Sequence, residues 1–204
     1  MKSWINSVKH NVHMMELNGK WNDSINYLYD LSVRYPDNVK ISCLFIAQCF
    51  WLIYERGFLE SNEKARPKGF FDIEWNFENK MQEKFLQGLE RFHDESFFQW
   101  YIGYLLNLGE YCFPPVVAFE SMFERACTLK PDGAIENAIA GKVEWMDEIE
   151  STFKKKLLAE IRSMDIQWNY TDAKLWYMFA RENTLKDDLE MRSYLEIGEV
   201  DYMK

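Results

Sequence analysis

Apolar residues recur at the spacing of an α-helix along almost the whole chain, and this period constrains the fold more than any other feature. Trp21, Ile25 and Leu28 fall on one stripe of a helix, and the same spacing returns over residues 77–92 and 145–161. Residues three or four positions apart share a helical face, whereas a half-buried strand needs alternation, which no segment shows convincingly. The 204 residues include only 9 Gly and 5 Pro, so few positions interrupt the helices. The sequence therefore predicts an all-α fold of eight or nine helices joined mostly by short loops.

Several helix starts can be placed from residues that favour the first turn. Asp72 and Asp132 can each accept a hydrogen bond from the free N–H groups of a following helix. Pro114-Pro115 suits a first turn, where the missing N–H of proline costs nothing. Thr171 and Thr184 are predicted N-caps of the last two helices.

One segment breaks the helical period. Residues 56–72 mix Gly, Pro, Ser and charged side chains, so we expect an insertion or a flexible crossing there. The prediction is a single all-helical domain over residues 1–204. Within it, residues 1–55 and 72–204 are a possible division, joined by a loop over residues 56–71.

The charge and the apolar content exclude several classes of protein. Hydrophobic residues make up 48% of the chain, which argues against a disordered protein. The formal net charge is −9, so the surface repels nucleic acid and anionic lipid and attracts basic proteins. The apolar run Ile41–Tyr54 is shorter than the ~20 residues that span a bilayer, and it contains Ser42 and Gln48. We therefore expect a buried core helix, with no membrane and no nucleic acid as partner.

The cysteines and the first residues of the sequence indicate a reducing compartment. Cys43, Cys49, Cys112 and Cys127 form no CxxC pair and lie in apolar, helix-patterned stretches, which is typical of buried free thiols. The segment MKSWINSVKHN contains no continuous apolar core of a signal peptide. We expect a cytoplasmic protein.

A pattern of turn and aromatic residues marks one helix-turn-helix unit over residues 5–38. Gly19 lies at the expected turn between the helices, Trp21 follows two positions later, and the small Ser24 allows close approach of the two helices. Tyr35-Pro36-Asp37-Asn38 then ends the second helix, because proline cannot continue it. With these residues the segment resembles a tetratricopeptide repeat (TPR), whose period is ~34 residues.

A weaker match to the same pattern spans residues 100–133. Gly109-Glu110-Tyr111 matches Gly19-Lys20-Trp21, and Leu129-Lys130-Pro131-Asp132 matches the closing turn, with CFPPVV as extra residues between them. Leu31 and Val12 depart from the pattern, because the family usually has small residues there. The resemblance implies an irregular αα-hairpin solenoid that binds peptides or proteins along a concave face. No residue matches the family's peptide-carboxylate clamp, and a generic helical bundle is the alternative fold.

No cluster of residues carries a convincing catalytic or metal-binding pattern. His10 and His13 share a helical face, but a zinc site needs three or four ligands. Glu90 and His93 have the spacing of a di-iron motif, of which the second copy is missing. The sequence contains no Gly-rich phosphate loop and no nucleophile elbow. We therefore expect no enzyme activity, no metal and no cofactor.

The sequence ends in an acidic stretch. Residues 182–204 hold seven acids and three bases, with tyrosines among them. Opposite charge speeds the encounter with a basic partner. The predicted partner-binding residues are Asp187, Asp188, Glu190, Tyr194 and Glu196. A solvated helix that caps the end of a solenoid is the alternative interpretation of the same acids.

The expected function is that of a non-enzymatic module that binds a protein. A small, acidic, all-helical chain without a catalytic signature is similar in character to bacterial toxin-immunity proteins, which neutralise basic toxins. This resemblance implies that the chain covers a basic partner, and it leaves the oligomeric state open. Two alternatives remain: a peptide-binding adaptor or scaffold, and a helical enzyme or ligand-binding bundle. The bundle would have a pocket lined by Trp100, Tyr101 and Tyr104 with a carboxylate such as Glu110 inside.

Overall fold

The computed structural model describes residues 2–140, and every regular element within them is a helix. The α-helices are α1 (Lys2–Leu17), α2 (Trp21–Arg34), α3 (Val39–Ser61), α4 (Glu78–Arg91), α5 (Ser96–Leu108), α6 (Phe119–Leu129) and α7 (Ala134–Ile139). Two short 3-10 helices, η1 (Phe70–Asp72) and η2 (Glu110–Cys112), lie in the connections. The all-α class is confirmed for this part of the chain. The predicted total of eight or nine helices also counts helices in residues 141–204, and these, like Thr171 and Thr184, lie outside the described residues.

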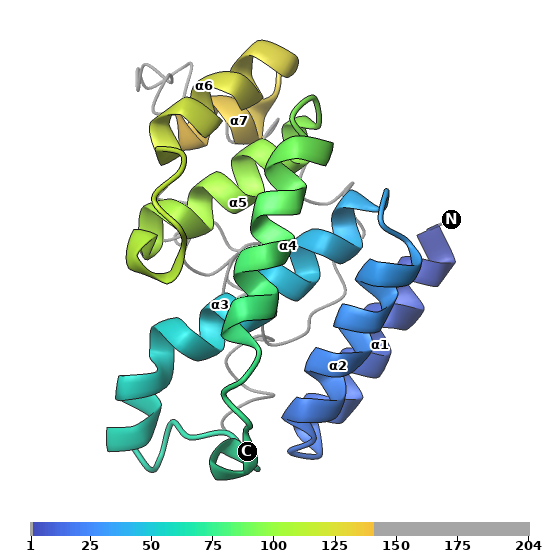
Figure 1. Ribbon diagram of the computed structural model, residues 1–204, viewed down its shortest axis with the longest axis vertical. Coiled ribbons are helices and arrows are strands. Elements are labelled where there is room, and N and C mark those ends of the chain that lie inside the picture. Colours follow the sequence, from blue (N-terminus) through green and yellow to red (C-terminus); the bar gives the residue numbers. More distant parts are fainter. Residues whose placement is uncertain (1, 141–204) are drawn as a thin grey trace, which may run out of the picture.

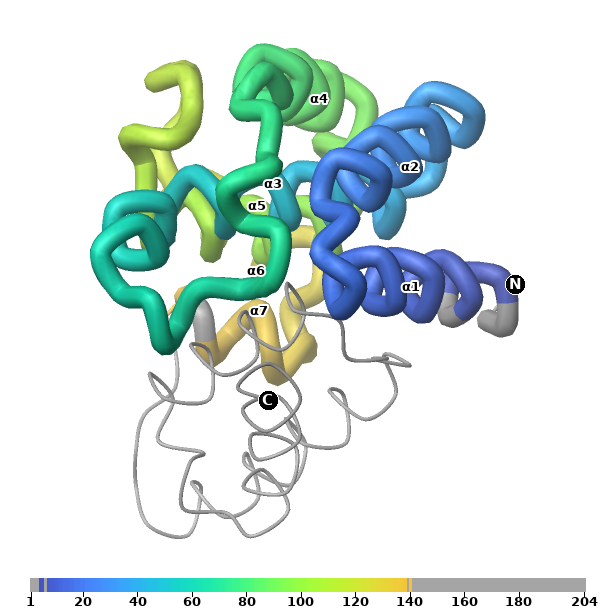
Figure 2. Tube along the Cα trace, turned by 90° about the horizontal axis from the view of Figure 1, so that it is seen from below, coloured from blue at the N-terminus to red at the C-terminus, as the bar shows by residue number. Residues whose placement is uncertain are grey.

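Helix α3 occupies the middle of the described residues. It contacts α2, α4 and α5, while α1 packs on α2, α6 packs on α5, and α7 packs on both α5 and α6. Figure 1 shows α1 and α2 side by side at one edge, with α5, α6 and α7 gathered at the other end. Figure 2 shows α2 and α4 as neighbours on the same side of α3. Most helices therefore pack against their neighbours in sequence, an arrangement compatible with a helical repeat.

The apolar run within α3 forms the centre of the core, as its composition predicts. Residues 41–52 are buried without interruption, because α3 is covered on every side rather than on one stripe. Asn38 caps the helix by accepting a hydrogen bond from the Ile41 N–H at 3.2 Å. Among residues 2–140, none of the helices has the length and apolar character needed to cross a bilayer.

The turn between α1 and α2 touches the loop that follows α3. Gly19 and Gly69 both adopt a φ of 73°, a backbone conformation that glycine reaches without strain. The two turns pack backbone against backbone, so that a Cβ on Gly69 would lie 2.2 Å from the Gly19 carbonyl oxygen. Glycine is therefore required at position 69 for two independent reasons, the left-handed φ and the close approach.

Two consecutive side chains of α2 fasten the same loop. The Trp21 indole N–H donates to the Lys68 carbonyl oxygen at 2.8 Å. The Asn22 amide donates to the Asp72 carbonyl oxygen at 2.9 Å and accepts from the Glu74 N–H at 2.9 Å. Trp21 is buried, as the repeat pattern predicts, but its polar edge binds a segment that no regular repeat contains.

The predicted loop over residues 56–72 begins later than expected. Helix α3 continues through Gly57 to Ser61, so the prediction is wrong for residues 56–61. Arg66 then folds back on the end of α3, donating to the Leu59 carbonyl at 3.0 Å and the Glu60 carbonyl at 2.7 Å. These bonds satisfy carbonyl groups that a helix end leaves without partners. The possible division of the chain at this loop stays a prediction, because most of its second part lies beyond residue 140.

The three helix starts predicted here from capping residues are wrong. Asp72 lies in η1, and α4 begins only at Glu78. Pro114-Pro115 precedes α6 by several residues instead of forming its first turn. Helix α7 begins after Gly133, so Asp132 is not its N-cap. In each case the connection takes up residues of its own before the helix begins, which a local capping signal does not reveal.

For the second repeat-like segment, residues 100–133, the structure contains the expected helix pair, but its aromatic residue is not buried as Trp21 is. Helices α5 and α6 pack against each other, and the predicted extra residues CFPPVV (112–117) lie in the connection between them. Gly109 is buried against Phe50 and Tyr54, where a Cβ would lie 2.9 Å from the Tyr54 ring. Tyr111, however, is 72% exposed and stacks on Tyr54, whereas Trp21 is 2% exposed. The two matched aromatic residues therefore play different structural roles.

All four cysteines are free and buried, as the sequence predicts. Burial raises the pKa of Cys43 and Cys49 well above the ordinary thiol value, and raises that of Cys112 to about 11. A thiol with a raised pKa forms little thiolate at neutral pH and is a poor nucleophile. These residues belong to the core.

Candidate functional site

The predicted partner-binding residues Asp187, Asp188, Glu190, Tyr194 and Glu196 lie outside the described residues. Their role therefore stays a prediction. Within residues 2–140, rows of exposed acids lie on α2 and α4, further exposed acids lie on α6 and in the connections, and a groove follows α1. These two surfaces are the candidates for a functional site in the described part of the chain.

Helix α2 turns a row of acids toward solvent. Asp23 and Asp30 are exposed two turns apart on one face, and the exposed Asp37 follows shortly after the helix ends. Val33 lies between Asp30 and Asp37 and is 55% exposed. An apolar side chain flanked by acids thus faces outward, while the opposite side of α2 packs into the core.

Helix α4 presents a similar row. Glu83 and Glu90 are exposed two turns apart, and Leu86 between them is 41% exposed. Met81 and Phe85 on the other side are completely buried. Both helices therefore show an apolar side chain between two carboxylates.

The lysines of α4 point away from this row and toward α2. The Nζ atoms of Lys80 and Lys84 lie 4.7 and 5.5 Å from the centroid of the Tyr29 ring, within the range of a cation–π contact. Lys84 is only 8% exposed and donates to Gln87 Oε1 at 3.2 Å. Burial lowers the pKa of Lys84. Because both amines turn into the seam between the helices, the outward row of α4 is dominated by its acids.

The exposed bases of α2 and α4 lie in their last turns. These are Arg34 and Arg91, placed where the helix dipole favours a positive charge. Arg91 Nη1 lies 3.7 Å from Asp37 Oδ1, and both side chains are well exposed, so solvent screens this pair. The "α2–α4 face" is defined by Asp23, Asp30, Val33, Asp37, Glu83, Leu86 and Glu90.

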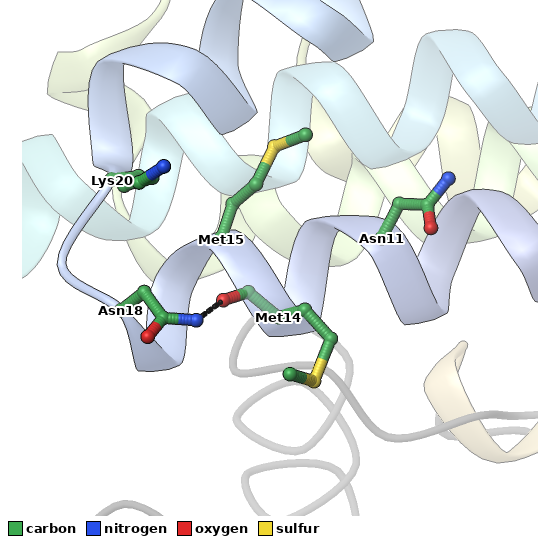
Figure 3. Close-up of a pocket in the computed structure, with 5 residues that line it drawn as sticks. All are labelled: Asn11, Met14, Met15, Asn18 and Lys20. Atoms are coloured by element: carbon green, nitrogen blue, oxygen red, sulfur yellow. Dashed lines mark hydrogen bonds between the residues drawn. The ribbon is translucent and has the colours of Figure 1, made fainter.

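A groove of about 460 Å³ lies along α1 and the turn that follows it. Figure 3 shows the five residues that line it, Asn11, Met14, Met15, Asn18 and Lys20. The two methionines point to opposite sides of α1 (Figure 3). Asn18 donates to the Met14 carbonyl at 2.7 Å, and Asn11 donates to the Tyr27 hydroxyl at 3.3 Å. None of these five residues carries a carboxylate.

Helix α1 has only one acidic residue, Glu16, and its side chain is 2% exposed. Gln48 of α3 donates through Nε2 to Glu16 Oε1 at 3.0 Å and to Ser24 Oγ at 2.7 Å. The Ser24 hydroxyl donates onward to the Trp21 carbonyl at 2.9 Å. One buried amide therefore links α1, α2 and α3, and it keeps the only carboxylate of α1 away from the surface.

The residues predicted for a ligand pocket do not meet in the interior. Trp100, Tyr101 and Tyr104 are buried and belong to the core, whereas Glu110 is exposed on η2. The expectation of a carboxylate inside an aromatic pocket is therefore wrong for Glu110. Among residues 2–140, no group of three or more His, Cys, Asp and Glu side chains is arranged to hold a metal ion.

Comparison with known proteins adds no relative from which a function can be carried over. No protein-family model, no curated protein and no solved structure matches this chain.

Proposed function

We propose that this chain is a helical module that binds a basic protein through the α2–α4 face. The observation that carries the proposal is the repeated arrangement of an exposed apolar residue between two acids, Val33 on α2 and Leu86 on α4. Interfaces gain most of their affinity from a few apolar or aromatic anchors, while surrounding charges speed and orient the encounter. The net charge of −9 favours a basic partner in the same way.

The finer form of the proposal is that the module neutralises its partner by covering it, as a toxin-immunity protein does. The acids predicted from the sequence, Asp187, Asp188 and Glu190, would contribute to the same binding. An irregular TPR-like solenoid is the proposed architecture, supported by the α1–α2 and α5–α6 pairs and by the contacts of α3 with both. The proposed location is the cytoplasm, which suits four free thiols.

The experiment compares two variants that change the net charge equally. The first carries Asp30→Lys, Glu83→Lys and Glu90→Lys on the α2–α4 face. The second carries Glu110→Lys, Glu120→Lys and Glu124→Lys, which are exposed acids elsewhere. Each tagged protein is used for affinity capture from its native cells at low salt, and retained proteins are identified by mass spectrometry.

We expect the wild type and the second variant to retain one stoichiometric basic protein, and the first variant to lose it. Titration calorimetry with the purified partner then measures the loss, and a salt series shows whether it is electrostatic. An assay of the partner's own activity separates a neutralising module from an adaptor. Equal retention by all three proteins would overturn the proposed face, and a stoichiometric metal or chromophore in the purified chain would favour the ligand-binding alternative.

A further inference from the structure

Helices α2 and α4 run in the same direction and nearly in register, because the contacts along them and the segments beside them occur in the same order. From the first turn of α2 onward these contacts are Asn22 with Asp72, Tyr29 with Lys80 and Lys84, and Asp37 with Arg91. Tyr29 reaches both lysines and so lies near the level of position 82. Asp30 on α2 is therefore close to the level of Glu83 on α4. Three positions farther along, Val33 and Leu86 form a second level.

Three sides of α2 are occupied, so its row of acids points outward. Leu28 is buried in the core, and Tyr29 faces α4. On the opposite flank, Tyr27 accepts a hydrogen bond from Asn11 of α1 at 3.3 Å. Asp30 follows Leu28 by two positions and therefore lies on the far side of the helix from the core. Because α2 and α4 lie on the same side of α3 (Figure 2), the outward rows of the two helices form one surface.

The spacing of the acids on this surface distinguishes a helical partner from an extended one. Acids recur every seven positions on both helices, namely Asp23 and Asp30 on α2 and Glu83 and Glu90 on α4. Seven residues of a helix rise about 10.5 Å, and a partner helix repeats one of its own faces at the same interval. A strand covers about 10 Å in three residues, and residues three apart point to opposite sides of a strand. The α2–α4 face therefore suits a helix better than an extended segment.

We propose that the α2–α4 face binds a basic amphipathic helix of its partner, lying along the seam between α2 and α4. The inference rests on the proposed function and names the element of the partner that this face would recognise. Apolar residues on one stripe of the partner helix would contact Val33 and Leu86. Lys or Arg residues on both flanks of that stripe would pair with the acids of α2 and α4, as the e and g residues of a coiled coil do. Lys80 and Lys84 turn into the seam, so the stripe that faces it has to be apolar rather than basic.

The test uses the full chain and three labelled synthetic peptides of about 14 residues, or two heptads. The first has Leu at the a and d positions, Lys at e and g, and Ala or Gln elsewhere. The second contains the same residues in an order that spreads Leu and Lys around the helix. The third is the first peptide with a central proline, which breaks the helix. Fluorescence anisotropy measures the affinities at low salt, and circular dichroism follows the helicity of each peptide on mixing.

We expect the first peptide to bind at least about tenfold more tightly than the other two, and to gain helicity when it binds. In the chain, Glu83→Gln together with Glu90→Gln should weaken this binding by about three- to tenfold, because two exposed ion pairs are lost. Glu120→Gln together with Glu124→Gln is the matched control. It makes the same change on two exposed acids of α6, outside the face, and should leave the affinity within about twofold.

Double-mutant cycles identify the lysine that each acid meets. Peptides with a single Lys→Gln change are combined with Glu83→Gln and with Glu90→Gln, and the coupling is the part of the loss that is not additive. The lysine coupled to Glu83 should lie seven positions from the lysine coupled to Glu90. Coupled lysines three positions apart would indicate an extended segment and would overturn the inference.

Three other results would overturn it: no binding of the first peptide at millimolar concentration, equal binding of all three peptides, or a dimer of the chain that the Glu83→Gln and Glu90→Gln variant abolishes in sedimentation. The last would mean that a second copy occupies the face. The proposed function is tested separately, by capture of the basic partner with the Asp30→Lys, Glu83→Lys and Glu90→Lys variant. Loss of the partner from that variant, without a preference among the peptides, would remove the helix and leave the function standing. Retention of the partner by that variant would remove both.

Discussion

Trp21 packs in the interface between helices and donates a hydrogen bond to the loop that follows α3. Two substitutions separate these roles. Its side chain is 2% exposed, and its N–H bonds to the Lys68 carbonyl at 2.8 Å. Trp21→Ala removes both the packing and the hydrogen bond, and we expect a loss of about 3–5 kcal/mol in the free energy of unfolding. Trp21→Phe keeps most of the buried ring but removes the donor, which should cost about 1–2 kcal/mol because Lys68 remains near solvent.

Urea unfolding followed by circular dichroism measures both changes. With a slope of roughly 2 kcal/mol per molar urea, Trp21→Ala should lower the unfolding midpoint by about 1.5–2.5 M, and Trp21→Phe by about 0.5–1 M. Tyr111→Ala is the control, because it removes an aromatic ring that is 72% exposed and should move the midpoint little. Limited trypsin cleavage after Lys64 and Lys68 reports the loop directly.

We expect Trp21→Phe to speed this cleavage more than its loss of global stability explains, because local opening needs less free energy than unfolding. A midpoint for Trp21→Ala that matches the wild type would refute the buried role of this residue. Unchanged cleavage in Trp21→Phe would refute the role of its N–H in holding the loop.

Three further changes test other parts of the structure. Gly69→Ala should lower the free energy of unfolding by at least about 2 kcal/mol, because it adds a Cβ at positive φ against opposing backbone. Gly57→Ala is the control: it lies in open space on α3 and should leave stability unchanged or raise it. Thermal melting compares the two variants. Cys112 has a pKa of about 11 in the folded chain and about 8.5 when unfolded, so its thiolate forms first in the unfolded state. Stability should therefore fall as pH rises from 8.5 through 11, and Cys112→Ala should make that fall shallower in urea titrations at each pH. Gln48→Glu places a second carboxylate beside Glu16 and should lower the free energy of unfolding by about 3–5 kcal/mol at pH 7. Part of this stability should return near pH 4, where one of the two acids is protonated. An equal loss of stability at both pH values would contradict this prediction.

The helical period predicted the fold class because the apolar residues that recur every three or four positions are the residues that helices bury against each other. The run Ile41–Tyr54 is apolar on every side and becomes the central helix, and Trp21 is buried as its spacing indicates. The helix starts failed because capping residues are equally suited to turns. Pro114-Pro115 shows this: its fixed backbone angle suits a first helical turn, but it lies in the connection before α6.

The contacts that shape the candidate surfaces could not be read from local sequence. Gly19 and Gly69 meet across fifty positions, and neither neighbourhood contains a signal of the other. The seven-residue spacing of Asp23 and Asp30 was visible in the sequence. That these acids and the acids of α4 form one surface depends on how the helices pack, because α2 and α4 lie side by side on α3 (Figure 2).

The burial of Glu16 links the stability of the helical core to the charge of its surface. Gln48 holds this carboxylate in the interior, where it joins α1 to α3, and the exposed side of α1 is left with bases. On the adjacent α2, Asp23 and Asp30 face solvent instead. The basic partner proposed for the α2–α4 face would therefore meet exposed acids on α2 and no exposed acid on α1. Specificity needs discrimination against wrong sites as well as attraction to the right one, and this difference between neighbouring helices would favour one orientation of the proposed partner.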